Sequence, residues 1–454
     1  MIRRLLARLI PGRPAHTPRI YGPGDHPVRR EQVSRGARTV TEKLHEAGFK
    51  GFVVGGAVRD LLLGLTPKDF DIATDATPEQ VKPLFRRAYV IGRRFRLVHV
   101  HVGAEVLEVS TFRAAQQGDD ATDEHGRLLS DNVYGTQDGD AARRDFTINA
   151  LYFDPASEEI WDYVGGVTDI RARRLKLIGA PVTRFREDPV RMLRAVRLAA
   201  KAGLAIDPKT AAPIPRLAGL IQNVPPARLF DEMQKLLLSG HATETLSSLR
   251  AHGLSHGLLP LLDVILEQPL GTKFIEVALA GTDARVREGK PVSPAFLFAT
   301  LLWHEVLQQW NTAKARGDKP IPALFDAMDR VLEAQAERIS IPRRFEATIK
   351  EIWALQPRFE QRAGARPFRL LEHERFRAAY DFLALRAESG EVPADLVDWW
   401  TRFQDAGEAE RAAMLRPDEA PKKGRRSRGR GRKRRAEAGD PDGAPPAADT
   451  RDAG

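Results

Sequence analysis

The segment GFVVGGAVRDLLLGLTPKDFD, residues 51–71, brings a glycine pair and two carboxylates into one short stretch. Its first residues form a β-rich run that ends at Gly55-Gly56, and a plausible helix begins directly afterwards. Glycine at such a turn lets backbone N–H groups and the helix terminus approach an anion, because no side chain keeps the anion away. Arg59, one turn into the helix, could then meet a phosphate. A tight turn without a ligand, with Arg59 paired to Asp60 at the surface, explains the same residues.

Asp69 and Asp71 are the second feature of this segment. In a strand over residues 69–74, side chains two apart point to the same face, so both carboxylates project together and Phe70 turns towards the core. Two like charges held about 7 Å apart repel each other unless a cation lies between them. Carboxylate oxygens suit Mg²⁺, which usually takes one or two protein carboxylates and substrate phosphates. The pattern therefore favours a magnesium site, with a plain turn as the alternative.

The composition limits what can surround this segment. A chain of 454 residues predicts two or three domains, and an apolar content of 42% excludes wholesale disorder. No apolar run approaches the roughly 18–20 residues that a membrane span needs. The absence of cysteine removes disulfides, thiolate zinc sites and cysteine nucleophiles, and it fits a reducing compartment such as the cytoplasm.

The charge is concentrated at the ends of the chain. The net charge is +10, and residues 421–435 (PKKGRRSRGRGRKRR) contain ten basic residues and no acidic residue. Basic ends of this density indicate a polyanionic partner, nucleic acid before anionic membrane. A solvated tail that aids solubility is the alternative.

The order of predicted elements indicates an α+β fold. Strand signals occur up to about residue 180, including a hairpin from 97–102 and 105–111, and a helix start capped by Thr77 precedes them. Polar residues 114–140 read as a mobile loop. Helices are predicted at 189–202, 226–238, 293–309, 321–338, 343–355 and 369–388. The chain thus divides into a basic lead (1–40), a head with a mixed sheet (41–180), an all-α neck (181–245), an all-α body (246–416) and a disordered basic tail (417–454).

Three residues on the predicted hairpin are candidate metal ligands. Glu108 is an acid in an otherwise apolar strand, which suits either a third carboxylate of the metal site or a half-exposed strand. His99 and His101 alternate on the neighbouring strand, but without cysteine or a third nearby ligand they make a poor zinc site.

Two arginine-rich segments carry further candidate residues. In RRDFTINA, residues 143–150, the basic Arg144 lies beside Asp145, and Asn149 follows one turn later if the segment is helical. This set suits a triphosphate and a ribose, or a charged helix start with an Asp–Asn pair. In residues 187–197 Asp188 caps a helix, and Arg191, Arg194 and Arg197 recur every three residues. Asp188 and Arg191 either form a local ion pair or read a base edge, while the later arginines face phosphates.

Together these segments resemble the nucleotidyltransferase superfamily, and within it the class that contains bacterial poly(A) polymerases and CCA-adding enzymes. The resemblance runs from about residue 31 to about 405 and rests on the order of VGGAVRD (54–60), KDFD (68–71), RRDFTINA (143–150) and EDPVR (187–191). The segments VIGRRFRLVHV (90–100) and LEHERFRAAYD (371–381), with the basic tail, are similar to the poly(A) polymerase branch.

The resemblance implies template-independent addition of AMP from ATP to RNA 3′ ends, promoting RNA turnover. It implies a small catalytic head, a helical neck (181–245) that recognises the nucleotide base, and a helical body (246–416) that serves as an RNA-binding region. It implies a two-metal Mg²⁺ site on Asp69 and Asp71, with Glu108 as the position matched to a third carboxylate, and an active-site role for Asp145. The positions that match nucleotide contacts are Gly55, Gly56, Arg59, Arg144, Asp188, Arg191 and Arg194. RNA-decay proteins become candidate partners.

The tail is the predicted RNA-binding segment, through Lys422, Lys423, Arg425, Arg426, Arg428, Arg430, Arg432, Lys433, Arg434 and Arg435. Two other functions stay open at this point. A CCA-adding tRNA nucleotidyltransferase would share every catalytic residue. A non-catalytic RNA-binding protein would use the basic ends alone, but it would leave Asp69, Asp71 and the glycine turn without a role.

Overall fold

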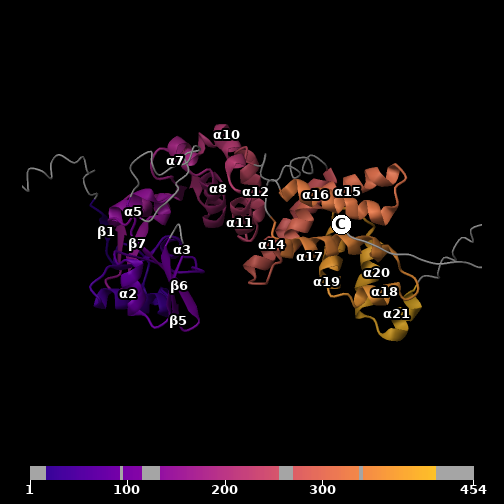
Figure 1. The fold of residues 1–454 in the computed structure, drawn as a ribbon, viewed down its shortest axis with the longest axis horizontal. Helices are drawn as coiled ribbons and strands as arrows, with labels where there is room; N and C mark the ends of the chain where they lie inside the picture. The colour runs from indigo at the N-terminus through magenta and orange to yellow at the C-terminus, as the bar shows by residue number, and fades with distance from the viewer. Residues whose placement is uncertain (1–16, 93–95, 115–132, 255–268, 337–340, 416–454) are drawn as a thin grey trace, which may run out of the picture.

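The computed structural model describes residues 17–92, 96–114, 133–254, 269–336 and 341–415. A head with a large β-sheet occupies the N-terminal end of the molecule, and mainly helices continue from it to the C-terminal end (Figure 1). The predicted α+β class, with a sheet head followed by helical domains, is confirmed.

The head is built on an eight-stranded sheet with the order β1-β8-β7-β2-β3-β6-β5-β4. β3 and β6 run parallel and the other neighbouring pairs antiparallel, so the sheet is mixed, as predicted. The strands are β1 (Arg19–Tyr21), β2 (Gly51–Val54), β3 (Asp71–Thr74), β4 (Ala88–Ile91), β5 (Leu97–Val102), β6 (Glu105–Thr111), β7 (Leu151–Asp154) and β8 (Glu159–Asp162).

The centre of this sheet positions the candidate site. β2 lies beside β3 with Val54 opposite Asp71, and β3 lies beside β6 with Asp71 opposite Glu108. The predicted hairpin is confirmed as β5 and β6, joined through Gly103 at φ 62°. β3 begins at Asp71, two residues later than predicted, so Asp69 precedes the strand.

Short helices flank the sheet. α2 (Arg35–Glu46) begins at Ser34, whose Oγ accepts from the Ala37 amide at 3.1 Å, and it buries Val40 and Leu44 against the sheet. β1 and the first half of α2 lie within the predicted basic lead, so residues of that segment contribute to the head. The other helices here are α3 (Gly56–Leu62), α4 (Pro78–Val81), α5 (Gln137–Arg143), α6 (Gly166–Arg171) and the 3₁₀ turn η4 (Thr147–Asn149).

A helical neck follows the head. α8 (Val190–Ala202) is its longest helix, and it ends at Gly203, whose φ of 60° is the left-handed conformation that glycine adopts without strain. A two-stranded parallel sheet joins β9 (Arg174–Leu175) to β10 (Ala205–Ile206). The remaining neck helices are α7 (Pro181–Glu187), α9 (Pro208–Ala211), α10 (Ile214–Leu217), α11 (Pro226–Leu237) and α12 (Ala242–Ala251).

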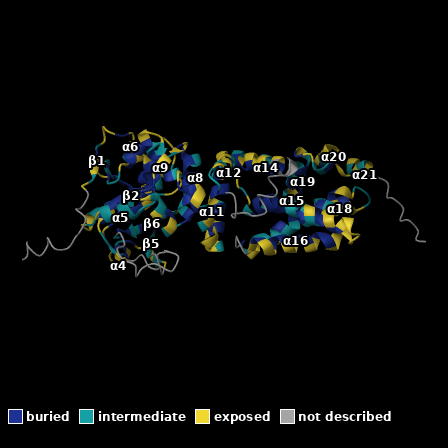
Figure 2. Cartoon of the chain, turned by 90° about the horizontal axis from the view of Figure 1, so that it is seen from above, coloured by how far each residue is buried: buried dark blue, intermediate teal, exposed yellow. Residues whose placement is uncertain are grey.

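The body packs longer helices around aromatic cores. Trp303, Trp353 and Phe382 are fully buried, and the Trp353 indole donates to the Ala299 carbonyl at 3.0 Å. Figure 2 shows the buried residues along the inner sides of these helices. The helices are α14 (Pro269–Arg287), α15 (Pro294–Ala315), α16 (Pro320–Ala336), α17 (Arg343–Leu355), η6 (Gln356–Glu360), α18 (Arg366–Leu371), α19 (Phe376–Glu388), α20 (Ala394–Asp405) and α21 (Glu408–Met414).

Two predicted segments need correction. The predicted helix over 369–388 is split into α18 and α19, because His373 forms a turn in which its Nδ1 accepts from the Arg375 amide and its carbonyl from the Phe376 amide. The predicted loop over 114–140 ends in α5, which starts at Gln137, and residues 115–132 of that prediction lie outside the described residues. Among the described residues, no helix is both long enough and apolar enough to span a membrane. The predicted disordered tail lies outside the described residues.

Candidate active site

The glycine turn lies at the end of β2. Gly55 has a φ of 76°, a conformation that other residues adopt only with strain, and its amide donates to the Leu151 carbonyl at 3.2 Å. A Cβ on Gly55 would lie 3.5 Å from Nη1 of Arg144, and a Cβ on Gly56 would lie 3.6 Å from Nη2 of Arg59. The predicted tight turn is therefore present, and two of the candidate arginines face it.

Arg59 is held inside the head rather than at its surface. It is 5% exposed, its Nε donates to Oδ1 of Asp60 at 2.8 Å, and its Nη1 donates to Oδ1 of Asn149 at 2.7 Å. The pairing with Asp60 that the sequence offered as the ligand-free explanation is thus present, but it is buried. Asp60 also lies 3.4 Å from Nζ of Lys201, so Arg59 belongs to a network that joins α3 to α8.

The candidate carboxylates gather where β3 starts. Asp71 lies beside Glu108 on the parallel strand, and Nε2 of His99 lies 3.5 Å from Oε1 of Glu108. Asp71 is exposed at the start of its strand, but the residues around it partly desolvate its carboxylate. This desolvation, followed by the negative charges of Glu108 and Asp69, raises the pKa of Asp71 to about 6, against the opposing charge of Arg144. The strand pairing therefore brings acids together in a way that disfavours full ionisation.

Arg144 is fixed by residues that the sequence did not single out. Its Nε and Nη2 donate to Oδ2 of Asp140 at 3.1 and 3.0 Å, and the Tyr152 hydroxyl donates to the same oxygen at 2.7 Å. Asp140 is 2% exposed. Burial favours protonation of its carboxyl, but the positive charges of Arg144 and Arg143 and the Tyr152 hydrogen bond outweigh it and lower the pKa. This anchor fixes the Arg144 guanidinium beside Gly55.

Asp145 binds an arginine of the neck. Its Oδ2 accepts from Arg194 Nε at 2.9 Å and from Nη2 at 2.5 Å, and its Oδ1 accepts from the Phe146 amide at 2.7 Å and Nδ2 of Asn149 at 3.2 Å. Arg194 also lies 3.7 Å from Oε1 of Glu232, a buried acid on α11. Asp145 and Arg194, both sequence candidates, thus meet each other across the junction of head and neck.

The same network predicts acid sensitivity. Burial favours protonation of Asp145, but the Arg194 charge and the hydrogen bonds from Arg194, Phe146 and Asn149 outweigh it and lower the pKa to about 2. Because the folded-state pKa is depressed, the stabilisation is complete above about pH 5 and is lost as the pH falls from about 4 to 2, at a total of about 2 kcal/mol. Urea unfolding between pH 2 and 6 measures this loss. Asp145→Asn should remove this component of the pH dependence, and an unchanged profile in that variant would contradict the assignment.

Asp188 and Arg191 do not pair with each other. Oδ2 of Asp188 accepts from Arg228 at 2.7 Å, whereas Nη1 of Arg191 donates to Oε2 of Glu187 at 2.9 Å and to the Arg184 carbonyl at 2.7 Å. The local ion pair considered from the sequence is therefore wrong. The predicted N-cap is also corrected, because Pro189 is the N-cap of α8 and Asp188 is the C-cap of α7. Oδ1 of Asp188 still accepts from the Val190 amide at 3.3 Å.

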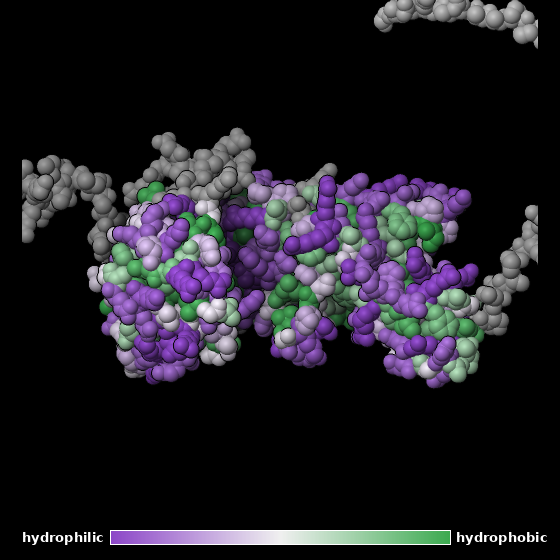
Figure 3. Space-filling model, turned by 60° about the horizontal axis from the view of Figure 1, so that its bottom comes forward, coloured by the Kyte–Doolittle hydropathy of each residue, from purple (hydrophilic) through white to green (hydrophobic). Residues whose placement is uncertain are grey.

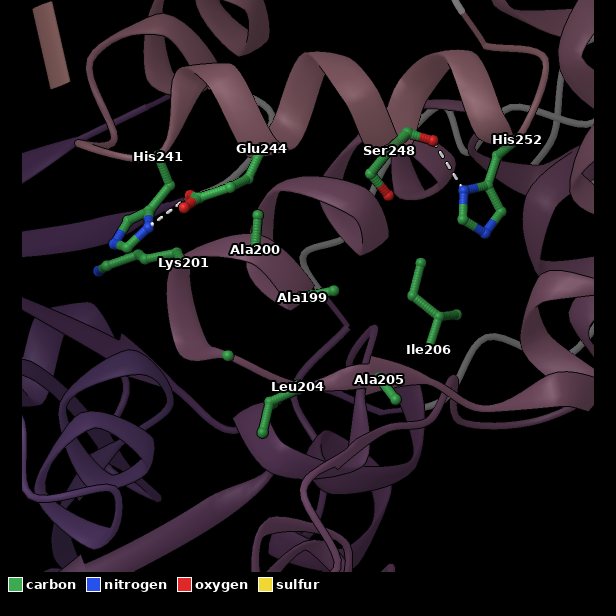
Figure 4. Close-up of a pocket in the computed structure, with 11 residues that line it drawn as sticks. Ala199, Ala200, Lys201, Leu204, Ala205, Ile206, His241, Glu244, Ser248 and His252 are labelled. Atoms are coloured by element: carbon green, nitrogen blue, oxygen red, sulfur yellow. Dashed lines mark hydrogen bonds and ion pairs between the residues drawn. The ribbon is translucent and has the colours of Figure 1, made fainter. Parts of the chain in front are cut away.

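The surface between head and body is hollowed and strongly hydrophilic on the face shown in Figure 3. A separate pocket of about 620 Å³ lies between α8, β10 and α12 (Figure 4). Its polar groups are already engaged, since His241 Nδ1 lies 2.9 Å from Oε2 of Glu244 and His252 Nδ1 lies 2.8 Å from the Ser248 carbonyl. None of the candidate nucleotide-binding residues lines this pocket.

The candidates therefore fall into three groups. Around the turn lie Gly55, Gly56, Arg59 and Arg144, and across the head–neck junction lie Asp145, Asp188, Arg191 and Arg194. Asp71 and Glu108 lie at the start of β3, which Asp69 precedes. The ten basic residues of the tail lie outside the described residues.

Three family models match consecutive parts of the chain. They are described as a poly A polymerase head domain (residues 51–176), a probable RNA and SrmB-binding site of polymerase A (203–266) and a polymerase A arginine-rich C-terminus (316–436). The order of the three models follows the order of head, neck and body in the fold.

Individual relatives agree with these models. Poly(A) polymerase I of Escherichia coli O157:H7 is 46% identical over 424 residues, which cover 90% of each chain. A CCA-adding enzyme of Bacillus pumilus is 39% identical over 199 residues, 44% of this chain and 48% of the relative. The crystal structure of the Bacillus stearothermophilus CCA-adding enzyme in complex with CTP is 28% identical, with a TM-score of 0.56 over 81% of this chain and 80% of that one. The resemblance to poly(A) polymerase I extends through head, neck and body, and the chain belongs to the bacterial poly(A) polymerase I family of class II nucleotidyltransferases.

Proposed function

We propose that this chain adds AMP from ATP to RNA 3′ ends without a template and releases pyrophosphate. The observation that carries the proposal is the register of β2 and β3, in which Val54 lies opposite Asp71. The Gly55-Gly56 turn, with Arg59 and Arg144 facing it, therefore lies beside the carboxylates. Nucleotidyl transfer requires hydrogen-bond donors for a triphosphate beside carboxylates that hold a metal. RNA binding alone requires neither.

The carboxylates fit Mg²⁺. In the described part of the chain, no three acidic or histidine side chains form a ready-made metal site, but Mg²⁺ usually takes one or two carboxylates and completes its shell with substrate phosphates and water. The pKa of Asp71 is raised first by desolvation and then by the negative charges of Glu108 and Asp69, and a cation would offset those charges. We infer that Asp69 and Asp71, with Glu108 beside them, hold the metals. Bound there, the metals would activate the RNA 3′-hydroxyl and neutralise the pyrophosphate leaving group.

The other residues then act by binding and positioning. Arg59 and Arg144 donate to the phosphates from fixed positions, because Asp60, Asn149 and Asp140 hold their guanidinium groups. The Asp145–Arg194 pair fixes the neck against the head. Asp188 and Arg191, near the junction, are proposed to contact the base.

The proposal extends to the cellular setting. Extended RNA 3′ ends would promote RNA turnover in the cytoplasm, with RNA-decay proteins as partners. The absence of cysteine supports such a reducing compartment.

Incubation with Mg²⁺ and each nucleoside triphosphate in turn tests the proposal. The substrates are a short RNA and a tRNA that lacks its 3′ end. Long homopolymer tails from ATP on both substrates are expected. Ordered addition of a few C and A residues to the tRNA alone would instead indicate a CCA-adding enzyme. RNA binding without incorporation would indicate a non-catalytic RNA-binding protein.

Arg191→Ala is expected to raise the ATP concentration needed for half-maximal rate and to weaken discrimination against CTP and GTP. A bidentate base contact is worth about 1–3 kcal/mol of discrimination, by analogy with base-edge readout in nucleic-acid grooves. Steady-state rates with each nucleotide measure the effect, and thermal melts separate it from the loss of the Glu187 contact. Arg186→Ala, at an exposed neighbouring position, serves as the control. Unchanged ATP affinity and selectivity in Arg191→Ala would contradict the base contact and would show that Arg191 has only a structural role.

Removal of the tail after Arg416 is expected to leave folding and AMP addition at saturating RNA intact. RNA affinity should fall and its salt dependence should flatten. Each phosphate contact to single-stranded RNA contributes about −0.7 to the slope of log affinity against log salt, so losing four contacts reduces the slope by about 3. RNA binding by both chains across a salt series measures this, and identical slopes would reassign the tail to protein contacts.

A further inference from the structure

A pocket on the body lies between α16, α17 with η6, and α18. Its volume is about 330 Å³, within the range of small-molecule sites, and Leu324, Ala354 and Leu370 form its apolar part. Three arginines line it and no carboxylate does. The pocket therefore combines an apolar surface with a positive rim, which is the combination that a nucleotide requires.

An exposed aromatic ring lies at this pocket. Phe325 on α16 is 45% exposed and Ile321, one turn earlier, is 48% exposed, whereas the adjacent Leu324 is fully buried. Phe325 thus lies outside the core of the body, and Figure 2 shows α16 with exposed residues along its outer side. Single exposed apolar residues are ordinary on protein surfaces, but a ring beside a pocket rimmed by arginines offers a surface on which a base can stack.

The three arginines at the rim are Arg358, Arg366 and Arg369, and all are exposed. Within the described residues their guanidinium groups make no hydrogen bond or ion pair. Some other arginines of the body are paired, as Arg375 is with Glu351 at 2.8 Å and Arg386 with Glu391 at 2.7 Å. Unpaired arginines around one pocket provide donors for phosphate oxygens.

A second pocket continues from the first and shares Ile321 and Gln361 with it. Its volume is about 880 Å³, and Nζ of Lys314 lies 3.9 Å above the Trp310 ring at its wall. Glu360 and Glu391 also line it, but Glu391 is bound by Arg386. The two adjoining pockets are together called the groove, and its unpaired arginines lie at the Phe325 end.

We propose that this groove binds single-stranded RNA, with a base stacked on Phe325 and the flanking phosphates on Arg358, Arg366 and Arg369. The inference rests on the proposed function, since it assigns the RNA substrate a second contact away from the reacting end. Stacking accepts any base, and phosphate contacts carry no sequence information. Such a subsite would hold RNA of any sequence while its end is extended.

Binding of a fluorescent 15-nucleotide oligoadenylate to the full chain, without ATP, tests this subsite. Phe325→Leu keeps an apolar side chain but loses the ring, and it should weaken binding about five-fold or more, while Phe325→Trp should bind like the unsubstituted chain. Replacing Arg358, Arg366 and Arg369 together by Gln should reduce the slope of log affinity against log salt by about 2, at about 0.7 for each contact. Arg330→Gln, exposed on the same helix but outside the pocket, should change neither quantity. Thermal melts confirm that each variant is folded.

The outcomes separate this inference from the proposed function. Weaker binding in Phe325→Leu supports the subsite even if the unsubstituted chain adds no AMP, a result that would overturn the proposed function alone. Unchanged affinity in Phe325→Leu, with an unchanged salt slope in the triple arginine variant, would overturn the subsite even in an active enzyme. In that case the groove would bind a ligand other than RNA, such as an acidic protein segment.

Discussion

Asp71→Asn is expected to reduce AMP addition several-hundred-fold or more without destabilising the fold. Losing one carboxylate of the metal site removes charge stabilisation of several kcal/mol, and each 1.4 kcal/mol corresponds to about a factor of ten in rate. The fold should be as stable as before, or slightly more stable, because Asp71 is exposed at the start of β3 and the substitution relieves its repulsion by the Glu108 carboxylate. Single-turnover rates with saturating RNA and ATP, together with melting temperatures, measure both effects.

Asp75→Asn is the matched control for this prediction. Asp75 follows the other end of β3, and its Oδ1 accepts from the Lys50 amide at 2.7 Å, a bond that asparagine can keep. This variant should retain the rate, and both variants should bind RNA normally because the basic surfaces are unchanged. A folded Asp71→Asn enzyme with a rate close to that of the unsubstituted chain would show that Asp71 holds no metal.

The parts of the site that were predictable are those whose determinants lie close together in the chain. The turn at Gly55, its position before a helix and the nearby Asp71 all fall within residues 51–71, and the structure places the turn and Asp71 side by side. Local sequence is sufficient here because glycine conformation and strand periodicity are local properties. The hairpin β5–β6 was predictable for the same reason.

The pairing of charged groups was not predictable in this way. Asp188 binds Arg228 across 40 positions, and Asp145 binds Arg194 across 49. The chain contains 71 Lys and Arg residues, so no local signal selects one partner among so many. Asp140 was missed because it lies in a Gly- and Asp-rich stretch that is typical of a loop. Only the fold reveals that Arg144 and Tyr152 bury it.

Arg194→Met should destabilise the protein by about 2–4 kcal/mol, between the cost of losing a hydrogen bond to a charged group and that of breaking a fully buried ion pair. The Asp145 side chain is 12% exposed, so without Arg194 its charge would be left nearly buried with only the Phe146 amide and Asn149 as donors. Its pKa should rise, and the junction of head and neck should loosen. Urea unfolding at pH 7 gives the free energy, and the double variant Asp145→Asn/Arg194→Met should lose less than the sum of the single losses.

Arg197→Met is the matched control on the same helix. Arg197 contacts Glu232 at 3.5 Å and its side chain is 14% exposed, whereas Arg194 contacts both Glu232 and Asp145. If the Asp145 contact carries the stabilisation, Arg194→Met should be the more destabilising of the two substitutions, and only Arg194→Met should weaken the acid sensitivity assigned to Asp145. Equal losses in the two variants would instead assign the stabilisation to Glu232, which both arginines share.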